Sequence, residues 1–250
     1  MNFNIFAISD LHLAISNKEK SMEVFEGWTD YTNKIKKNWL KKIKDNDICL
    51  IPGDISWAMK FEDSLIDLNW INNLPGRKVI LRGNHDYWWP SYTKLSKSLP
   101  KSIFAISNNV INFENVSIGG SKLFDSIEYN FDDYINFVKN PLESYDNEEE
   151  IQKDLKENIL LRELNRLTLS LEQLNKDAKY KIALTHYPPI SADLKDSRAS
   201  KILERFNIDK CIFGHLHSVN KNKKLFGEKN KIDYILASAD YINFDPIKIY

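Results

Sequence analysis

The most informative stretch of the sequence is KVILRGNHD, which runs from Lys78 to Asp86. It begins as a short apolar run typical of a buried strand and then changes abruptly to glycine, amide, imidazole and carboxylate groups. In open α/β sheets, ligands bind beyond the carboxyl ends of the strands. A strand that ends in Asn84, His85 and Asp86 therefore predicts an α/β fold with a functional site at that edge of the sheet.

The same kind of apolar run recurs along the chain. Runs that suit buried strands occupy residues 3–9, 48–51, 78–81, 103–106, 116–118, 181–184, 210–213 and 234–237. Apolar residues at helical spacing lie between several of them, at 30–44 and 61–74. This alternation predicts an α/β sheet with helices on its faces. The stretch 104–120 is typical of β-hairpins without helices between them.

A longer helix is expected over residues 148–176, where leucines recur at steps of four and three. These leucines are Leu160, Leu164, Leu167, Leu171 and Leu174. They could form a coiled-coil seam between two chains, or they could pack on the body of their own domain. The segment is short for a coiled coil, so we favour packing. Without a repeat or a linker, residues 1–250 are expected to form a single domain.

The composition restricts the classes of function. Lys+Arg and Asp+Glu are equal at 35 each, so the neutral net charge gives no reason to expect nucleic acid as a partner. The longest apolar runs are far shorter than the roughly 20 residues that span a bilayer, and the N-terminus does not resemble a signal peptide. Cys49 and Cys211 both lie in apolar runs, which predicts buried thiols in a reducing compartment. We therefore expect a cytoplasmic protein without a membrane partner.

All five histidines lie in short motifs at the ends of predicted strands. The motifs are Asp10-Leu11-His12, Pro52-Gly53-Asp54, Arg82-Gly83-Asn84-His85-Asp86, Thr185-His186-Tyr187 and Gly214-His215-Leu216-His217. Side chains two residues apart on an extended segment face the same side, so each Asp-x-His or His-x-His pair can point at one ion. Carboxylate with imidazole suits Mn, Fe, Zn or Ni better than Mg or Ca. The donors are too many for one ion and suit two ions that share a bridging carboxylate.

Each of these motifs has an ordinary alternative interpretation. Most Asp-x-His pairs arise by chance, a histidine beside Pro-Pro is commonly a packed loop residue, and Gly-Asn-His-Asp can be a simple turn. Together, however, the motifs follow predicted strands one after another and use every histidine of the chain. Chance is then a poor explanation, and a shared metal site is the better one.

The order of these motifs resembles that of the calcineurin-like metallophosphoesterase superfamily, which is D-x-H, G-D, G-N-H-D/E, H and G-H-x-H. The resemblance spans the chain from Asp10 to His217. It implies a four-layer α/β/β/α sandwich, in which helices flank two mixed sheets. It also implies a ligand set: Asp10, His12 and His217 for one metal, Asn84, His186 and His215 for the other, and Asp54 as the bridge. His85 would stay free as the general acid for the leaving oxygen, oriented by Asp86.

The activity that this resemblance implies is hydrolysis of a phosphate ester by a hydroxide that bridges two divalent transition metal ions. Manganese is the expected ion, with iron, zinc and nickel as alternatives, and the expected partner is a small phosphate ester. The stretches GDISWAM (53–59) and RGNHDYWW (82–89) are similar to an uncharacterised bacterial phosphohydrolase branch. The alternative is a phosphodiesterase or nuclease that acts on nucleotides or nucleic acid. A scaffold without activity is disfavoured, because His85 and every ligand are present.

Arg82 precedes Gly-Asn-His as in the protein Ser/Thr phosphatase branch, where such an arginine holds phosphate. Gly53-Asp54 is not followed by x-x-D-R-G, which argues against that branch itself. We expect Arg82 to bind the substrate phosphate, the alternative being a salt bridge at the strand end.

Aromatic residues are concentrated directly after two of the motifs, and they are Trp57, Tyr87, Trp88, Trp89 and Tyr92. They could stack on a substrate or pack between helix and sheet, and packing is favoured.

Overall fold

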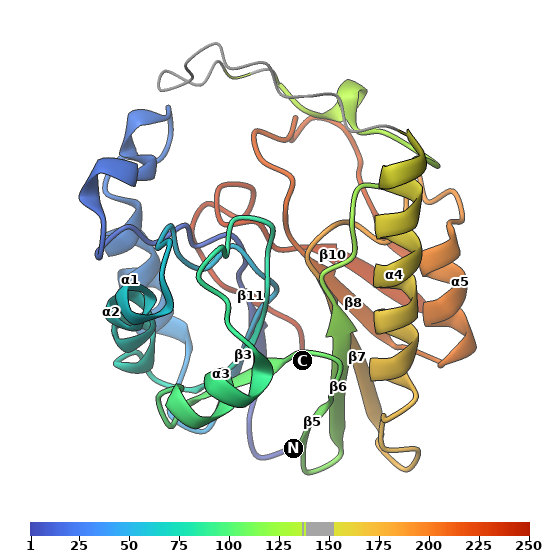
Figure 1. Cartoon of the computed structure of the whole chain (residues 1–250), viewed down its shortest axis with the longest axis horizontal. Helices are drawn as coiled ribbons and strands as arrows, with labels where there is room; N and C mark the ends of the chain where they lie inside the picture. The colour runs from blue at the N-terminus through green and yellow to red at the C-terminus, as the bar shows by residue number, and fades with distance from the viewer. Residues whose placement is uncertain (137, 139–152) are drawn as a thin grey trace.

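The computed structural model describes residues 1–136, 138 and 153–250, whose strands form two sheets that face each other (Figure 1). From edge to edge, the first sheet contains β11 (Ile247–Lys248), β1 (Ile5–Ala7), β2 (Ile48–Ile51), β3 (Arg77–Leu81) and β4 (Ile103–Ile106). The second contains β5 (Ile111–Phe113), β6 (Val116–Ser121), β7 (Tyr180–Thr185), β8 (Lys210–Phe213), β10 (Ile232–Leu236) and β9 (Gly227–Lys229).

Both sheets are mixed, with parallel strands inside and antiparallel strands at edges. In the first sheet β1 to β4 are parallel and β11 is antiparallel to β1. In the second sheet β6, β7, β8 and β10 are parallel, whereas β5 and β9 run antiparallel to their neighbours. The parallel strands of each sheet therefore end at the same edge. A parallel bridge between Ser9 and Ser238 links the two sheets where β1 and β10 end.

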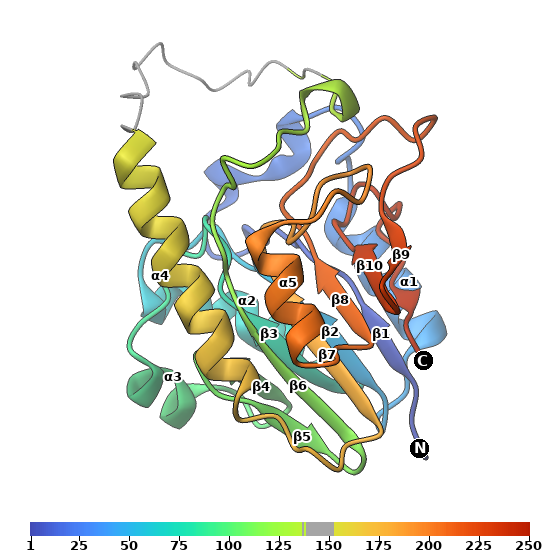
Figure 2. The ribbon, with the colours of Figure 1, turned by 90° about the vertical axis from the view of Figure 1, so that its right-hand side faces the viewer.

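Helices cover the outer face of each sheet (Figures 1 and 2). The first sheet is covered by α1 (Tyr31–Lys42), α2 (Phe61–Asn72) and α3 (Tyr92–Ser98). The second is covered by α4 (Lys153–Leu171) and α5 (Arg198–Arg205). Short 3₁₀ turns occur at Lys18–Lys20, Met22–Val24 and Asp132–Tyr134. The predicted four-layer α/β/β/α sandwich is confirmed.

The strands are continuous apolar runs because both of their faces are buried. In β1, Ile5 and Ala7 pack between the two sheets, whereas Phe6 packs toward the helices of the first sheet. In β7, Ile182 lies between the sheets and Ala183 packs toward the helices of the second. This alternation gives three apolar layers, which hold the strand ends in fixed positions.

The long helix predicted over 148–176 is α4, which covers Lys153–Leu171, while residues 148–152 lie outside the described residues. The leucines expected to pack on their own chain do so, because all five are buried within it: Leu160, Leu164, Leu167, Leu171 and Leu174. The prediction of hairpins throughout 104–120 was partly wrong. Only β5 and β6 form one, since β4 joins the first sheet and the chain then crosses to the second.

The sequence did not predict α3, α5, β9 or β11. A capping box starts α5, in which Ser197 and Ser200 exchange hydrogen bonds, so a local signal for this short helix existed. Cys49 and Cys211 are buried free thiols, as predicted. Within the described part of the chain, no helix has the length and apolar character needed to cross a membrane.

Candidate metal centre

The side chains predicted to bind metal meet at the carboxyl ends of the strands. In the first sheet they follow β1, β2 and β3, and they are Asp10 with His12, Asp54 and Asn84. In the second sheet they follow β7 and β8, and they are His186, His215 and His217. Because both sheets contribute, the site exists only when the two sheets are packed together.

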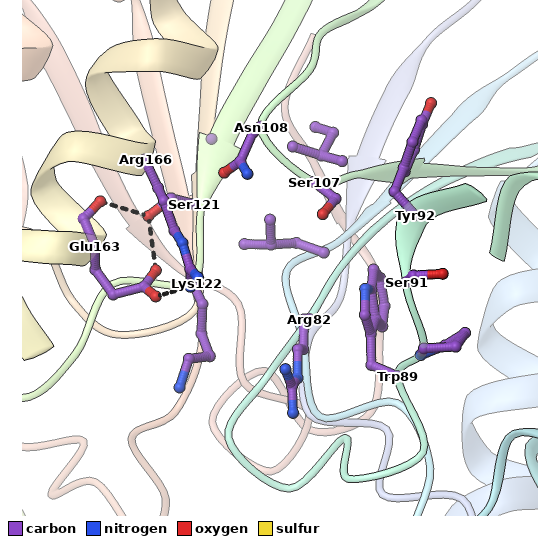
Figure 3. A pocket seen from close by; sticks show the side chains of 14 residues that line it. Arg82, Trp89, Ser91, Tyr92, Ser107, Asn108, Ser121, Lys122, Glu163 and Arg166 are labelled. Atoms are coloured by element: carbon purple, nitrogen blue, oxygen red, sulfur yellow. Dashed lines mark hydrogen bonds and ion pairs between the residues drawn. The ribbon is translucent and has the colours of Figure 1, made fainter. Parts of the chain in front are cut away.

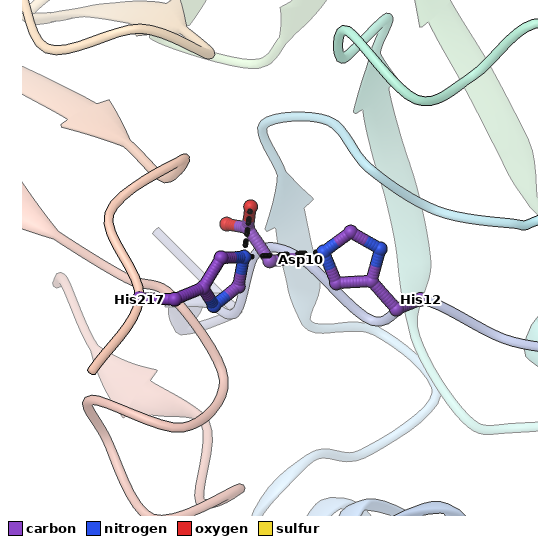
Figure 4. A group of neighbouring side chains, drawn as sticks. All are labelled: Asp10, His12 and His217. Atoms are coloured by element: carbon purple, nitrogen blue, oxygen red, sulfur yellow. Dashed lines mark hydrogen bonds and ion pairs between the residues drawn. The ribbon is translucent and has the colours of Figure 1, made fainter. Parts of the chain in front are cut away.

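The first group of candidate ligands consists of Asp10, His12 and His217 (Figure 4). The Nε2 atoms of His12 and His217 lie 3.1 Å apart. The His217 Nε2 atom is also 3.5 Å from Oδ1 of Asp10. Nε2 of His12 is 3.7 Å from Oδ2 of Asp54, which connects this group to a second one.

The second group contains Asn84, His186 and His215. The Asn84 side-chain oxygen lies 2.6 Å from Nε2 of His186 and 3.1 Å from Nδ1 of His215. Oδ2 of Asp54 lies 3.4 Å from the same His186 nitrogen. The same carboxylate oxygen of Asp54 therefore faces both groups.

The hydrogen bonds of two histidines indicate that a cation belongs between these atoms. Nδ1 of His186 lies 2.9 Å from the carbonyl oxygen of Pro52, which can only accept, so this nitrogen carries a proton. In the neutral ring, Nε2 then presents a lone pair to the oxygens of Asp54 and Asn84. In the same way, Nδ1 of His217 pairs with Oδ1 of Asp240 at 2.9 Å, which directs Nε2 toward Asp10.

A proton or a metal ion can supply the missing positive charge. Burial lowers the pKa of His186, but the Asp54 carboxylate outweighs burial and raises the pKa to about 9. Donor atoms 2.6–3.7 Å apart are also spaced like neighbouring ligands of an ion with bonds of about 2.0–2.2 Å. The residues present therefore fit divalent metal ions, which is what the histidine and carboxylate motifs predicted.

The backbone holds the ligands in conformations that few residues adopt. Positive φ angles occur at Asp10 (57°), His12 (44°), Asp54 (50°) and His215 (72°). Such strained conformations cluster at functional sites, where the surrounding structure stabilises them.

Two glycines leave space for the carboxylates. A Cβ atom on Gly83 would collide with the Asp54 side chain, and one on Gly214 would collide with Asp10. The close approach of neighbouring loops therefore requires glycine at both positions.

Hydrogen bonds also keep the two buried carboxylates ionised. The backbone N–H of His215 donates to both oxygens of Asp10, at 3.0 and 3.1 Å. The backbone N–H of His85 donates to Oδ1 of Asp54 at 2.9 Å. Burial raises the pKa of Asp10, yet the hydrogen bond and charge of His217 lower it to about 2. The pKa of Asp54 is also well below its usual value, because His186 outweighs burial.

Several residues that brace the centre were not assigned a role from the sequence. Asp240 pairs with Nδ1 of His217 and also accepts the backbone N–H of Ser218 at 2.8 Å. The signal for Asp240 was its position shortly after a parallel strand, although no motif marks it. Trp28 contacts the rings of His12 and His217 edge-on, and this position carried no recognisable signal.

His85 borders the centre without belonging to either ligand group. Its ring centroid lies 5.7 Å from that of His12 and 4.6 Å from that of Trp57. Burial lowers the pKa of His85, while the nearby Asp54 opposes this change. Among the described residues, Nδ1 of His85 has no hydrogen-bond partner.

Asp86 is bound to the backbone rather than to the His85 ring. Its carboxylate accepts the N–H groups of Ile55 at 2.9 Å and Gly83 at 2.7 Å, and the indole N–H of Trp88 at 2.9 Å. Burial, reinforced by Asp54, raises the pKa of Asp86 to about 6. The orienting role expected of Asp86 would therefore act through the loop that carries His85.

Some aromatic residues near the metal centre are packed against other side chains, and others are exposed to solvent. Trp57 is half-buried and stacks on His12, with centroids 4.9 Å apart and planes inclined by 20°. Trp88 is buried in the core, as the packing interpretation predicted, whereas Tyr87 and Tyr92 are exposed.

The side chain of Arg82 is also exposed, and it forms no salt bridge with any described residue. The alternative of a salt-bridged Arg82 is therefore not supported.

Taken with this geometry, the sequence identifies the class of protein. It matches the calcineurin-like phosphoesterase family over residues 3–219, a range that includes both ligand groups. The chain belongs to this family, and membership implies a metal-dependent hydrolase that acts on phosphoesters. A comparison with curated proteins gave no match.

Solved structures resemble this chain in fold. A phosphopantetheinyl hydrolase from Mycobacterium tuberculosis is 13% identical, with a TM-score of 0.53 over 98% of this chain and 95% of that chain. A protein of unknown function from Aquifex aeolicus is 21% identical, with a TM-score of 0.47 over 99% and 96% of the two chains. A protein from Thermus thermophilus, TT1561, is 13% identical, with a TM-score of 0.46 over 86% and 82% of the two chains. At these identities the likeness concerns the fold alone.

Proposed function

We propose that this chain hydrolyses a phosphate ester with two divalent metal ions held on either side of Asp54. The observation that supports this most is the shared carboxylate oxygen, which faces His12 in one group at 3.7 Å and His186 in the other at 3.4 Å. A carboxylate with a histidine nitrogen on each side is suited to bridging two ions. Asp10, His12 and His217 would hold one ion, and Asn84, His186 and His215 the other.

When bound, the ions would neutralise charge on the phosphoryl oxygens and supply a hydroxide nucleophile at neutral pH. Imidazole donors favour Mn, Fe, Zn or Ni over Mg and Ca. Manganese is the ion that we propose, because oxygen donors accompany the imidazoles, the Asp10 carboxylate in the first group and the Asn84 amide in the second.

His85 is proposed as the general acid that protonates the leaving oxygen. It lies beside the ligands but outside both groups, so its ring is free to hold a proton for the substrate. Its lowered pKa makes the protonated ring a stronger acid and also reduces the fraction of rings that are protonated at neutral pH. Asp86 would support this role by fixing the loop between β3 and His85.

The substitution Asp54→Asn tests the proposal, because it keeps the shape of the side chain and removes its charge. We expect less bound metal and a loss of activity of about 10²–10³-fold or more on nitrophenyl phosphate with Mn²⁺. Metal content is measured by plasma mass spectrometry, and Asp63→Asn is the matched control, since Asp63 is exposed on α2. Full activity in metal-stripped wild-type protein would contradict the proposal.

A further inference from the structure

A cavity of about 200 Å³ lies between the segments that follow β3, β4 and β6 and the helix α4 (Figure 3). Its lining carries three cationic side chains and one carboxylate, which are Arg82, Lys122, Arg166 and Glu163. In Figure 3, Arg166, Glu163 and Lys122 lie on one side and Arg82 on the other. We call this cavity the basic cleft.

Two of the three cations, Arg82 and Lys122, form no salt bridge in the part of the chain that the structure describes. Arg82 is exposed, and the Lys122 ammonium lies near the rings of Tyr187 and Phe124, at 5.6 and 5.9 Å from their centroids. Arg166 pairs with Glu163 at 2.5 Å, and Glu163 also accepts a hydrogen bond from the Ser121 hydroxyl. The basic cleft therefore has an excess of positive charge, which attracts anions.

The backbone of both residues adjoins segments that carry candidate metal ligands. Arg82 precedes Asn84 by two residues. The carbonyl oxygen of Lys122 accepts the backbone N–H of His186 at 3.1 Å and that of Tyr187 at 3.0 Å. Residues that adjoin metal-binding segments of both sheets therefore line the basic cleft.

We propose that Lys122 and Arg166 of the basic cleft bind a second anionic group of the substrate, a carboxylate or another phosphate. Arg82, on the other side of the cleft, is left to contact the phosphate that is cleaved. This inference rests on the proposed function, because the metal centre must take the reacting phosphate. Guanidinium and ammonium groups form strong charge-assisted hydrogen bonds with such anions. The volume suits one compact group, since sites for whole ligands measure about 300–1,000 Å³.

Phosphonates test the proposal, because their C–P bond is not an ester and persists during the measurement. Calorimetry on Mn²⁺-loaded protein gives the Kd of ω-carboxyalkylphosphonates with chains of two to five carbons and of alkylphosphonates of equal length. We expect the carboxylate to increase affinity by about 10-fold at one or more of these lengths. A parallel series of α,ω-bisphosphonates shows whether a second phosphate binds better than a carboxylate.

The variants Lys122→Gln and Arg166→Gln should each reduce this gain, with the alkylphosphonate of equal length as the reference in the same protein. The matched control is Arg162→Gln, because Arg162 is exposed one turn earlier on α4 and does not line the basic cleft. The proposal is wrong if no chain length in either the carboxylate or the bisphosphonate series shows the gain, or if the full gain persists in both variants. If the simple alkylphosphonates do not bind to the Mn²⁺-loaded protein, that result would contradict the proposed function instead.

Discussion

The metal centre and the basic cleft are neighbours that are built in opposite ways. In the metal centre, Asp10, Asp54 and His186 are almost fully buried, and each is hydrogen-bonded to backbone. In the basic cleft, Arg82 is exposed and Lys122 is half-buried without a salt bridge to any described residue. Buried donors in strained backbone suit ions that stay bound, whereas accessible cations suit a group that arrives and leaves with each turnover. This difference is what the two proposals rest on, metal binding for one region and recognition of the substrate for the other.

The largest effect that should separate catalysis from metal retention is that of His85→Asn. Hydrolysis of an alkyl phosphate should fall by about 10²–10⁴-fold, because its basic leaving oxygen needs a proton. Nitrophenyl phosphate should be affected much less, since nitrophenolate leaves as a stable anion. Steady-state kinetics on both substrates and plasma mass spectrometry are the measurements, and metal content should not change. Equal losses on both substrates, with loss of one metal, would make His85 a ligand instead.

Within the metal centre, Asp240→Asn should weaken metal binding by about 10–100-fold. The carboxylate fixes the His217 tautomer through its 2.9 Å contact with Nδ1, and the amide would remove that charge. Competition with a chelator measures the affinity, and Asp45→Asn, at an exposed position after α1, is the control. An unchanged metal affinity would show that Asp240 only supports the fold.

In the basic cleft, Arg82→Ala should raise KM for a phosphomonoester by about 10-fold and leave Tm nearly unchanged. Tm should not change, because the side chain is exposed and forms no salt bridge with the described residues. KM should rise more for a dianionic monoester than for a monoanionic diester, because Coulomb attraction to the guanidinium scales with the charge of the phosphate. A large fall in Tm with intact kinetics would support a structural role for Arg82.

The smallest effect concerns the pH dependence of the metal-free protein. The folded pKa of His186 is raised from 6.5 to about 9, so its protonation stabilises the fold below pH 6.5 and this contribution is lost as pH rises through 9. Tm of metal-free protein should therefore fall between pH 7 and 9. The stabilisation by Mn²⁺ should grow over the same range, because ions compete with protons for the ligands. A metal-free Tm that is flat in wild type and in His186→Gln would contradict this assignment.

The structure brings the predicted ligands together because each lies within a few residues of the end of a buried strand, and parallel strands must end at the same edge of a sheet. Asp10, Asp54 and Asn84 could be placed in this way without coordinates. Asp240 was not assigned a role, although it follows β10, the parallel neighbour of the strand β8 that precedes His217. The order of neighbouring strands in a sheet is not encoded in any local pattern, and no motif marks Asp240.

The basic cleft was harder to predict, because its residues lie far apart in the sequence. Arg82 stood out beside a motif, but Lys122 and Arg166 lie in separate segments without distinctive neighbours. They come together only because α4 packs on the second sheet next to β6. The short strands β9 and β11, of three and two residues, carry too few residues for a period-2 pattern to be recognised.

The number of metal ions bound per chain is the most direct test of the metal centre. Plasma mass spectrometry on protein saturated with Mn²⁺ and freed of excess ion should give two ions per wild-type chain, and fewer in Asp54→Asn. Activity should rise with the occupancy of the second ion. Full phosphoesterase activity with at most one bound ion per chain would contradict the assignment of Asp54 as a bridge.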